Sequence, residues 1–306
     1  MTILKTHDLK KTYRRTKALD GVNLTIEKGD IYGFIGKNGA GKTTLIRLIT
    51  GVAEPTSGSF TLFGQREPKA IIKARSKMAA VVESPALHLN LSAYDNLKLQ
   101  CILLGIKENH SQVIQRTLEK VDLASLLIEK KKKAKNFSLG MRQRLGIAMA
   151  LINNPEFLIL DEPNNGLDPE GIRDMRTLLL KLNQTEGLTI LVSSHILSEL
   201  SKLATRYGFI HQGRLLKEIT SAELNRASRQ ATVLTLNLPI KDETIFSKAG
   251  LQDYEISGNQ LKIYGSQSTN LYLSLLSNAG FEVMQINKEA DDLETFFMKM
   301  IGGQSL

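Results

Sequence analysis

The chain opens with alternating apolar and polar positions, a pattern that predicts two short strands at 3–9 and 22–26. The segment 31–35 is apolar without interruption, which is typical of a strand buried on both faces of a sheet. It leads into apolar positions at helical spacing over 44–49. A turn region rich in glycine and proline then precedes a further expected strand at 59–63.

Helical patterns and short apolar runs alternate from residue 92 to residue 204. Ser92 is placed to cap the first of these helices. The expected elements are two helices within 92–127, a helix at 139–153, a strand at 157–160, a helix at 170–185, a strand at 189–193 and a helix at 196–204. Strands that alternate with helices predict an α/β domain with a largely parallel central sheet.

The pattern changes near Thr220, so we expect a first domain of residues 1–220 and a small second domain of residues 221–306. The expected strands of the second domain are 232–238, 254–257, 260–264 and 282–287, and its expected helices are 242–249, 269–279 and 293–301. The order β-α-β-β-α-β is that of a ferredoxin-like unit of the α+β class.

Composition places this chain of 306 residues among ordinary globular proteins, with 42% hydrophobic and 23% charged residues. Its one cysteine, Cys101, excludes an intramolecular disulfide and a cysteine-based zinc site. No apolar run approaches the roughly 18 residues of a membrane span, and the N-terminus lacks the apolar region of a secretion signal. These features predict a cytosolic location.

The net charge is +9, and the basic residues are scattered apart from the run Lys130–Lys135. No aromatic interleaving or zinc-finger spacing accompanies the run, so no specific nucleic-acid partner is expected. A solvated charged loop is the favoured interpretation of the run. Contact with anionic lipid headgroups is the alternative.

Residues 36–43 read G-K-N-G-A-G-K-T, fit the pattern G-x-x-x-x-G-K-[ST], and lie between a predicted buried strand and a predicted helix. Glycines let backbone N–H groups surround phosphates, and the helix N-terminus attracts negative charge. Lys42 is suited to reach the β- and γ-phosphates, and Thr43 to bind Mg²⁺. The predicted nucleotide contacts are Gly36, Lys37, Asn38, Gly39, Ala40, Gly41, Lys42, Thr43 and Thr44. A glycine-rich turn before a helix is the simpler alternative.

The fully apolar strand at 157–160 ends in two carboxylates, Asp161 and Glu162. Asp161 is placed to hold Mg²⁺, and Glu162 is the candidate catalytic carboxylate that polarises the attacking water. A strand that ends in Asp-Glu is common by itself, but downstream of a phosphate loop it completes a nucleotide site. ATP and Mg²⁺ are therefore the expected cofactors.

A third segment, F-S-L-G-M at 137–141, stands at the start of a helix just ahead of the acidic strand. With the two motifs above, it resembles the signature of the ATP-binding subunits of ABC transporters, although only Ser138 and Gly140 match the family's Leu-Ser-Gly-Gly-Gln consensus. The resemblance covers residues 1 to about 220. It implies a P-loop NTPase, ABC-type nucleotide-binding domain with a helical subdomain at about 84–150. It also implies that Ser138 and Gly140 contact the ATP held by the opposite subunit of a dimer.

Other positions match the same family one by one. Tyr13 stands where an aromatic ring stacks on adenine, with a half-buried strand tyrosine as the alternative. Residues 166–168 resemble the loop that crosses between subunits. His195 stands at the family's switch histidine, which contacts the γ-phosphate, and it is the second candidate catalytic residue.

Glu83 departs from the family, which usually has a glutamine that contacts Mg²⁺ and the lytic water. We expect Glu83 to be a metal ligand, although an ionised carboxylate cannot donate a hydrogen bond. Glu83, the variant signature and the long C-terminal extension resemble the subgroup that exports or resists peptide antibiotics such as lantibiotics and bacitracin.

The resemblance implies an ATPase that dimerises around two ATP, expected to be a homodimer, and that powers a separate permease from the cytoplasmic side of the membrane. The permease is expected to dock on residues 84–127. A non-transport ABC ATPase acting on the ribosome or DNA is one alternative, but the long coiled coils or second ATPase domain of such proteins are not found in this sequence. The other is a nucleotide-gated regulatory protein whose second domain binds a small ligand.

Overall fold

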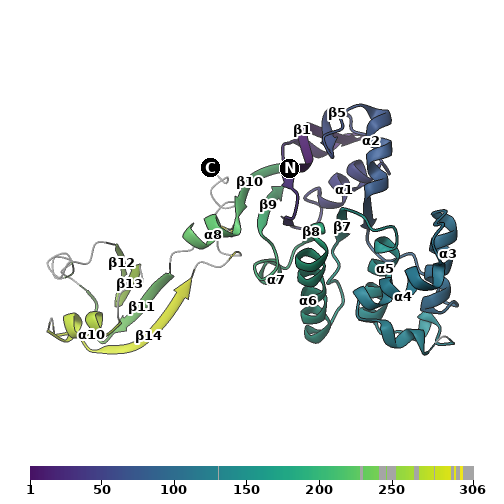
Figure 1. The fold of residues 1–306 in the computed structure, drawn as a ribbon. Coiled ribbons are helices and arrows are strands. Elements are labelled where there is room, and N and C mark those ends of the chain that lie inside the picture. The colour runs from purple at the N-terminus through teal and green to yellow at the C-terminus, as the bar shows by residue number, and fades with distance from the viewer. Residues whose placement is uncertain are drawn as a thin grey trace. The chain divides into compact units, whose positions relative to one another are not determined.

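The computed structural model describes residues 1–129, 131–227, 230–240, 246, 253–264, 269–278, 280–290, 293 and 297–298. The chain divides into two compact units, Met1–Ser221 and Ala222–Leu306 (Figure 1). Within the described residues, no helix is both long and apolar enough to cross a lipid bilayer.

A six-stranded sheet forms the centre of the first unit, in the order β10-β9-β4-β8-β7-β6. Its strands are β4 (Ile31–Ile35), β6 (Met78–Val81), β7 (Phe157–Asp161), β8 (Thr189–Ser194), β9 (Arg206–His211) and β10 (Arg214–Thr220). All neighbours are parallel except β9 and β10, which form an antiparallel hairpin. Every residue of β4, β7 and β8 is buried, which explains their apolar runs. The predicted α/β domain with a largely parallel sheet is confirmed.

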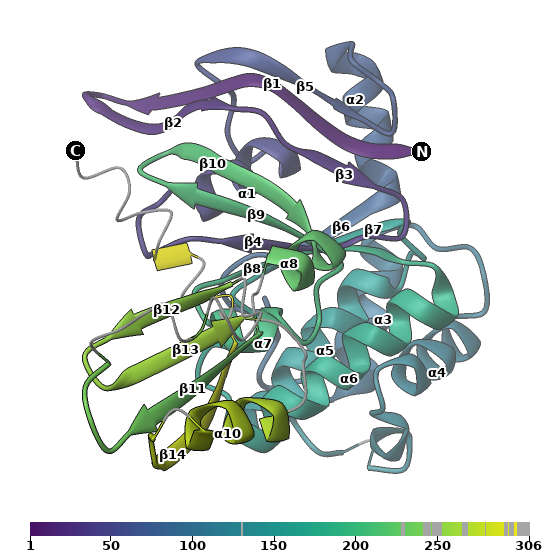
Figure 2. The ribbon, with the colours of Figure 1, turned by 90° about the vertical axis from the view of Figure 1, so that its left-hand side faces the viewer.

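Helix α1 (Lys42–Thr50) lies between this sheet and a second, antiparallel sheet (Figure 2). The strands of the second sheet are β1 (Thr2–Tyr13), β2 (Thr16–Val22), β3 (Thr25–Glu27) and β5 (Ser57–Leu62). The prediction of only two strands before residue 30 was wrong. β1 pairs with β2 along its second half and with β3 along its first, and register shifts interrupt both ladders. Irregular pairing of this kind hides the strands from a strict alternation of apolar and polar residues.

Helices α5 (Leu139–Leu151) and α6 (Pro169–Glu186) cover the opposite face of the central sheet (Figure 2). The helix expected at 196–204 is only the four-residue α7 (Leu197–Leu200). A short helix, α2 (Pro68–Ala74), and a 3₁₀ turn (Arg75–Lys77) precede β6. The Arg75 side chain donates hydrogen bonds to the carbonyls of Ile49 (2.9 Å) and Leu48 (3.3 Å), which closes the C-terminal end of α1.

The helical subdomain contains α3 (Ala93–Leu103) and α4 (His110–Lys120), which pack against α5, and 3₁₀ turns at Ala124–Leu127 and Ala134–Asn136. The Ser92 hydroxyl accepts a hydrogen bond from the Asp95 backbone N–H at 3.1 Å, so Ser92 caps α3 as predicted. The end of the basic run 130–135 is joined to the residues just before α3, because the backbone N–H of Ala134 donates to the Leu91 carbonyl at 2.8 Å.

The second unit contains a four-stranded antiparallel sheet in the order β12-β13-β11-β14. Its elements are α8 (Ser221–Ala227, which starts at the end of the first unit), β11 (Gln230–Leu236), β12 (Tyr254–Ser257), β13 (Gln260–Tyr264), α10 (Thr269–Asn278) and β14 (Val283–Ala290). Leu234, Leu261 and Ile263 of the sheet pack with Tyr272 and Leu276 of α10. Most of the helices expected at 242–249 and 293–301 lies outside the described residues, so the complete ferredoxin-like unit stays a prediction.

The loop after β6 packs closely on α5, and this contact is testable. A Cβ added to Gly146 would overlap the ring of Pro85. Gly146→Ala is therefore expected to lower the free energy of unfolding by about 1–3 kcal/mol, despite the better helix propensity of alanine. Gly140→Ala on the same helix is the control, because its nearest neighbour is Leu167 Cδ2 at 3.8 Å. If denaturant unfolding shows the same loss of stability in Gly146→Ala and Gly140→Ala, the close contact between Gly146 and Pro85 does not matter for stability.

Candidate active site

The phosphate loop runs from the end of β4 to the start of α1, and two of its glycines are required by close packing. A Cβ on Gly36 would lie 2.6 Å from the carbonyl oxygen of Ile210. Gly41 has a φ of 114° and would meet the carbonyl oxygen of Ala18 at 2.6 Å. The loop is thus held against its neighbours, and the backbone N–H groups of the first turn of α1 have no partner within the helix. This is the geometry that anions favour.

Lys42 is the first residue of α1, and its side chain is only 6% exposed. Its ammonium donates to the carbonyls of Gly36 at 2.6 Å and Lys37 at 3.4 Å, inside the loop. It also forms an ion pair with Glu162 Oε1 at 3.1 Å. The cation is thereby fixed within the phosphate loop.

Asp161 is buried at the end of β7 and accepts two hydrogen bonds from hydroxyl groups. Thr43 Oγ1 donates to its Oδ2 at 2.8 Å, and Ser193 Oγ donates to its Oδ1 at 2.5 Å. Mg²⁺ binds in proteins through one or two carboxylates together with phosphate oxygens. The hydroxyl of Thr43 and the carboxylate of Asp161 form a hard-oxygen pair beside the phosphate loop, which fits Mg²⁺.

Glu162 has a φ of 52°, a conformation that a non-glycine residue adopts only where its surroundings enforce it. Its backbone N–H donates to both the hydroxyl (3.0 Å) and the carbonyl (3.2 Å) of Ser193. Its carboxylate lies between Lys42 and His195, with Oε2 2.7 Å from His195 Nδ1. The turn of the backbone thus aims Glu162 at the loop while Asp161 remains buried.

The signature residues lie elsewhere on the unit, at the start of α5. Ser138 caps α5 by accepting a hydrogen bond from the Met141 N–H at 3.2 Å. Ser138 and Gly140 line a cavity of about 340 Å³ together with Leu167 and Asp168, and Asp168 caps α6. The structure therefore brings the signature segment and the loop 166–168 to one open surface.

Two further predicted residues, Tyr13 and Glu83, are exposed. Tyr13 ends β1 and is 43% exposed, and the Lys11 ammonium lies 4.9 Å from its ring centroid. Glu83 follows β6, has a φ of 62°, and pairs with Arg47 of α1 at 2.8 Å in an exposed position. Val81 lies opposite Leu160, so the parallel strands bring Glu83 to the same edge of the sheet as Glu162.

Ser193 is a functional candidate that sequence reasoning missed. Ser193 lies opposite Asp161 in the ladder between β7 and β8, which is why it can serve both carboxylate residues. No local pattern marks it. Only knowledge of the strand order would have pointed to it.

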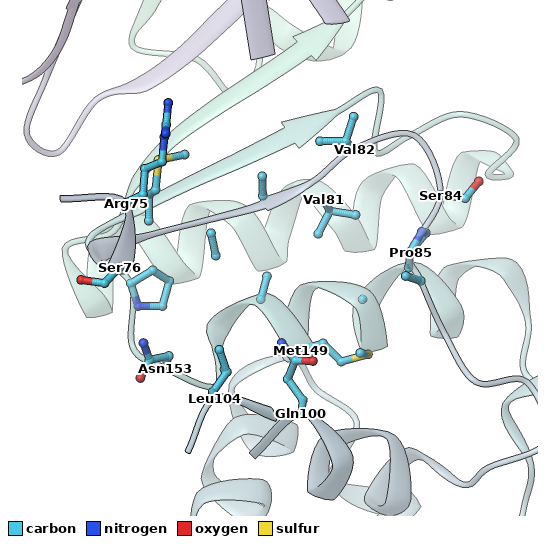
Figure 3. A pocket seen from close by; sticks show the side chains of 17 residues that line it. Arg75, Ser76, Val81, Val82, Ser84, Pro85, Gln100, Leu104, Met149 and Asn153 are labelled. Carbon is cyan, nitrogen blue, oxygen red and sulfur yellow. The ribbon is translucent and has the colours of Figure 1, made fainter. Parts of the chain in front are cut away.

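A second cavity, of about 660 Å³, lies beside the edge strand β6 (Figure 3). Its wall includes Ser84 and Pro85 of the loop after β6, Gln100 and Leu104 at the end of α3, and Met149 of α5. We call this cavity the β6 groove. It begins at the loop that carries Glu83, so it adjoins the nucleotide site through the chain itself.

A phosphate loop between a buried strand and a helix, with a carboxylate pair ending a neighbouring strand, defines a P-loop ATPase domain. Residues 19–165 match the family model described as ABC transporter. The chain belongs to this family, as the ATP-binding subunit that hydrolyses ATP.

The chain is similar over its full length to bacitracin transport ATP-binding proteins called BcrA. It is 40% identical to that of Bacillus licheniformis (100% of this chain, 99% of the relative) and 37% identical to that of Enterococcus faecalis (98% and 97%). It is also 45% identical to the lantibiotic transport ATP-binding protein SrtF of Streptococcus pyogenes, over 71% of this chain and 90% of SrtF. The predicted resemblance to the subgroup that acts on bacitracin and lantibiotics is thereby confirmed.

Solved structures of ABC ATP-binding proteins share the fold of the first unit. One is cbiO1 from Clostridium perfringens, part of the transporter complex cbiONQ, with a TM-score of 0.66 and 27% identity over 74% of this chain and 91% of cbiO1. Another is the dimeric ATP-binding cassette MJ0796 bound to ADP and Pi, with a TM-score of 0.63 and 25% identity over 72% and 99%. The predicted ABC-type fold is confirmed by these similarities.

The hydroxyl of Ser193 provides the first functional test. Ser193→Ala removes a donor to Asp161 and an acceptor for the Glu162 N–H. We expect kcat for ATP hydrolysis to fall about 10-fold, equivalent to ~1.4 kcal/mol, with little change in ATP affinity. Ser201→Ala, at an exposed serine after α7, is the control. Wild-type turnover in Ser193→Ala would exclude a role in holding the carboxylates.

Proposed function

We propose that two copies of this chain bind two ATP between them and drive a separate permease that exports, or gives resistance to, a peptide antibiotic of the bacitracin or lantibiotic kind. The cargo class rests on the relatives, whose names specify bacitracin and lantibiotic transport. The bacitracin relatives match through the second unit as well, whereas SrtF matches 71% of the chain, which favours a bacitracin-like cargo.

The observation that carries the proposed chemistry is the placement of Glu162 between Lys42 and His195. Lys42 and the backbone of residues 36–44 bind the phosphates, and Tyr13 stacks on the adenine. Glu162 accepts a hydrogen bond from the attacking water, and His195 orients that carboxylate through the 2.7 Å contact with Oε2.

Thr43, Asp161 and Glu83 are the proposed residues for Mg²⁺, which supplies charge neutralisation to the phosphates when bound. The contact between Thr43 and Asp161 supports the first two. Glu83 is supported by its position at the same edge of the sheet as Glu162. In the structure the negative charge of Glu83 is paired with Arg47.

Dimerisation is supported by the cavity that Ser138 shares with Asp168. The hydroxyl of Ser138, the N–H groups at the start of α5 and Gly140 suit a phosphate, and Ser138 is exposed to receive one from another subunit. A homodimer would use the same surface twice, as a two-fold axis requires.

The β6 groove is the proposed docking surface for the permease, which would hold the chain at the cytoplasmic side of the membrane. Leu104, which lines the groove, is an exposed apolar side chain, and Ile102 and Leu103, which precede it in the chain, are also exposed. An apolar segment of a partner could bury them. Because the groove begins at the loop that carries Glu83, a docked partner would sense changes at the nucleotide site.

Glu162→Gln tests the proposed catalytic carboxylate. The amide is too weakly basic to take up a proton from the attacking water, so hydrolysis should fall at least about 100-fold while ATP binding is kept. An ATP-dependent dimer should accumulate and be visible by light scattering. Glu156→Gln, at the other end of the same strand, is the control, since Glu156 pairs with Lys77 at the surface. Full turnover in Glu162→Gln would remove the assignment.

Leu104→Glu tests the docking surface, because a charge in the β6 groove opposes apolar contact with a permease. The isolated subunit should keep its basal ATPase activity, and stimulation by membranes that contain the permease should be lost. Ile72→Glu introduces the same charge at an exposed apolar residue of α2 outside the groove. If both variants are stimulated like wild type, the groove does not receive the permease.

A further inference from the structure

An ion pair joins α6 to α7, the short helix that follows His195. Arg176 of α6 and Glu199 of α7 lie 2.8 Å apart, from Nη1 to Oε2. Their side chains are 21% and 17% exposed, and each of the other Arg–carboxylate pairs described in the first unit has at least one more exposed member, including Arg206 with Asp30 at 29% and 19%. Sheltered pairs with good geometry constrain their helices more strongly than exposed pairs do.

The segment that carries His195 depends on such outside contacts. His195 stands between β8 and α7, and α7 has only four residues, too few to be stable alone. The Ile196 N–H donates to the Ser194 hydroxyl at 2.9 Å, and Leu200 is buried. Glu199 provides the polar contact of this segment with α6.

Arg176 lies on a long helix that is anchored by buried side chains. α6 has 18 residues, and Met175, Leu178, Leu179 and Leu182 are buried against the unit. The helix begins at Asp168, which caps it by accepting from the Gly171 N–H at 2.9 Å and lines the cavity shared with Ser138. Arg176 lies about two turns further along.

We propose that Arg176 is a positioning residue for His195. Through Glu199 it ties the turn after His195 to α6, and through α6 to the surface where the second subunit is proposed to bind. His195 then keeps its Nδ1 on Glu162 Oε2 only while α6 is in place. The inference rests on the proposed role of His195 in hydrolysis.

Lys202 is the other cation near Glu199, at 3.3 Å from Oε1. It is 57% exposed and belongs to the same segment as α7, so it cannot replace the link to α6. Loss of Arg176 would leave Glu199 charged and paired only locally. The buried Leu200 would still anchor the segment, but the position of His195 relative to α6 would no longer be fixed.

The test compares Arg176→Gln and Glu199→Gln with wild type in steady-state ATP hydrolysis. A displaced catalytic group lowers kcat, so we expect about a 10-fold loss in kcat with an ATP dissociation constant within about twofold of wild type. The exchanged pair, Arg176→Glu with Glu199→Arg, should recover most of the loss. Lys181→Gln is the matched control, because it removes an exposed ion pair with Asp122 from the same helix.

A cycle with His195→Ala separates positioning from general destabilisation. Once His195 is absent, Arg176→Gln should cause no further loss of kcat. A further tenfold loss of kcat when Arg176→Gln is added to His195→Ala would overturn the inference. Wild-type kcat in both Arg176→Gln and Glu199→Gln would also overturn it. If His195→Ala itself retains full turnover, the proposed role of His195 fails first. A low kcat in His195→Ala with a normal kcat in Arg176→Gln would refute only the positioning role.

Discussion

Three elements of the first unit meet at Asp161, and the two hydrogen bonds that its carboxylate accepts hold the site together. Thr43 donates from the start of α1 and Ser193 from β8. Because β4, β8 and β7 are parallel neighbours, their carboxyl ends reach the same edge of the sheet, where ligands of such sheets bind. A shift of one residue in the register of β7 on β8 would remove the Ser193 contact and turn Glu162 away from the phosphate loop.

Charge pairing explains why the site can be assembled before ATP binds. Lys42 is almost fully buried, and a buried cation without a partner would be costly, so its contact with Glu162 stabilises the loop. Phosphates offer Lys42 a larger negative charge than one carboxylate does. We expect ATP to draw Lys42 from Glu162 and to leave that carboxylate to His195 and the attacking water. The pair of Lys42 with Glu162 would then stabilise the site before ATP binds, and both residues would take part in the reaction after it binds.

Most of the nucleotide site was predictable from sequence because its motifs are contiguous. The phosphate loop and the acidic strand each place their chemistry within a few residues, so the two motifs together predicted roles for Lys42 and Asp161, and these roles stay predictions. Ser193 was missed because its contact with Asp161 depends on two strands being neighbours. The pair of Glu83 with Arg47 was missed for the same reason, since it joins a loop to a helix 36 residues away. Among the elements, β1 was predicted too short because its register shifts interrupt the apolar alternation.

Recovery of the tagged chain from native membranes in mild detergent tests the central claim most directly. If the chain is the ATPase subunit of a separate permease, it should be recovered in stoichiometric amounts with a polypeptide that has several membrane spans, and with two ATPase copies per complex. The identity of that polypeptide would also indicate the cargo. Recovery of the chain with ribosomes, with DNA or without any partner would contradict the proposed transport function.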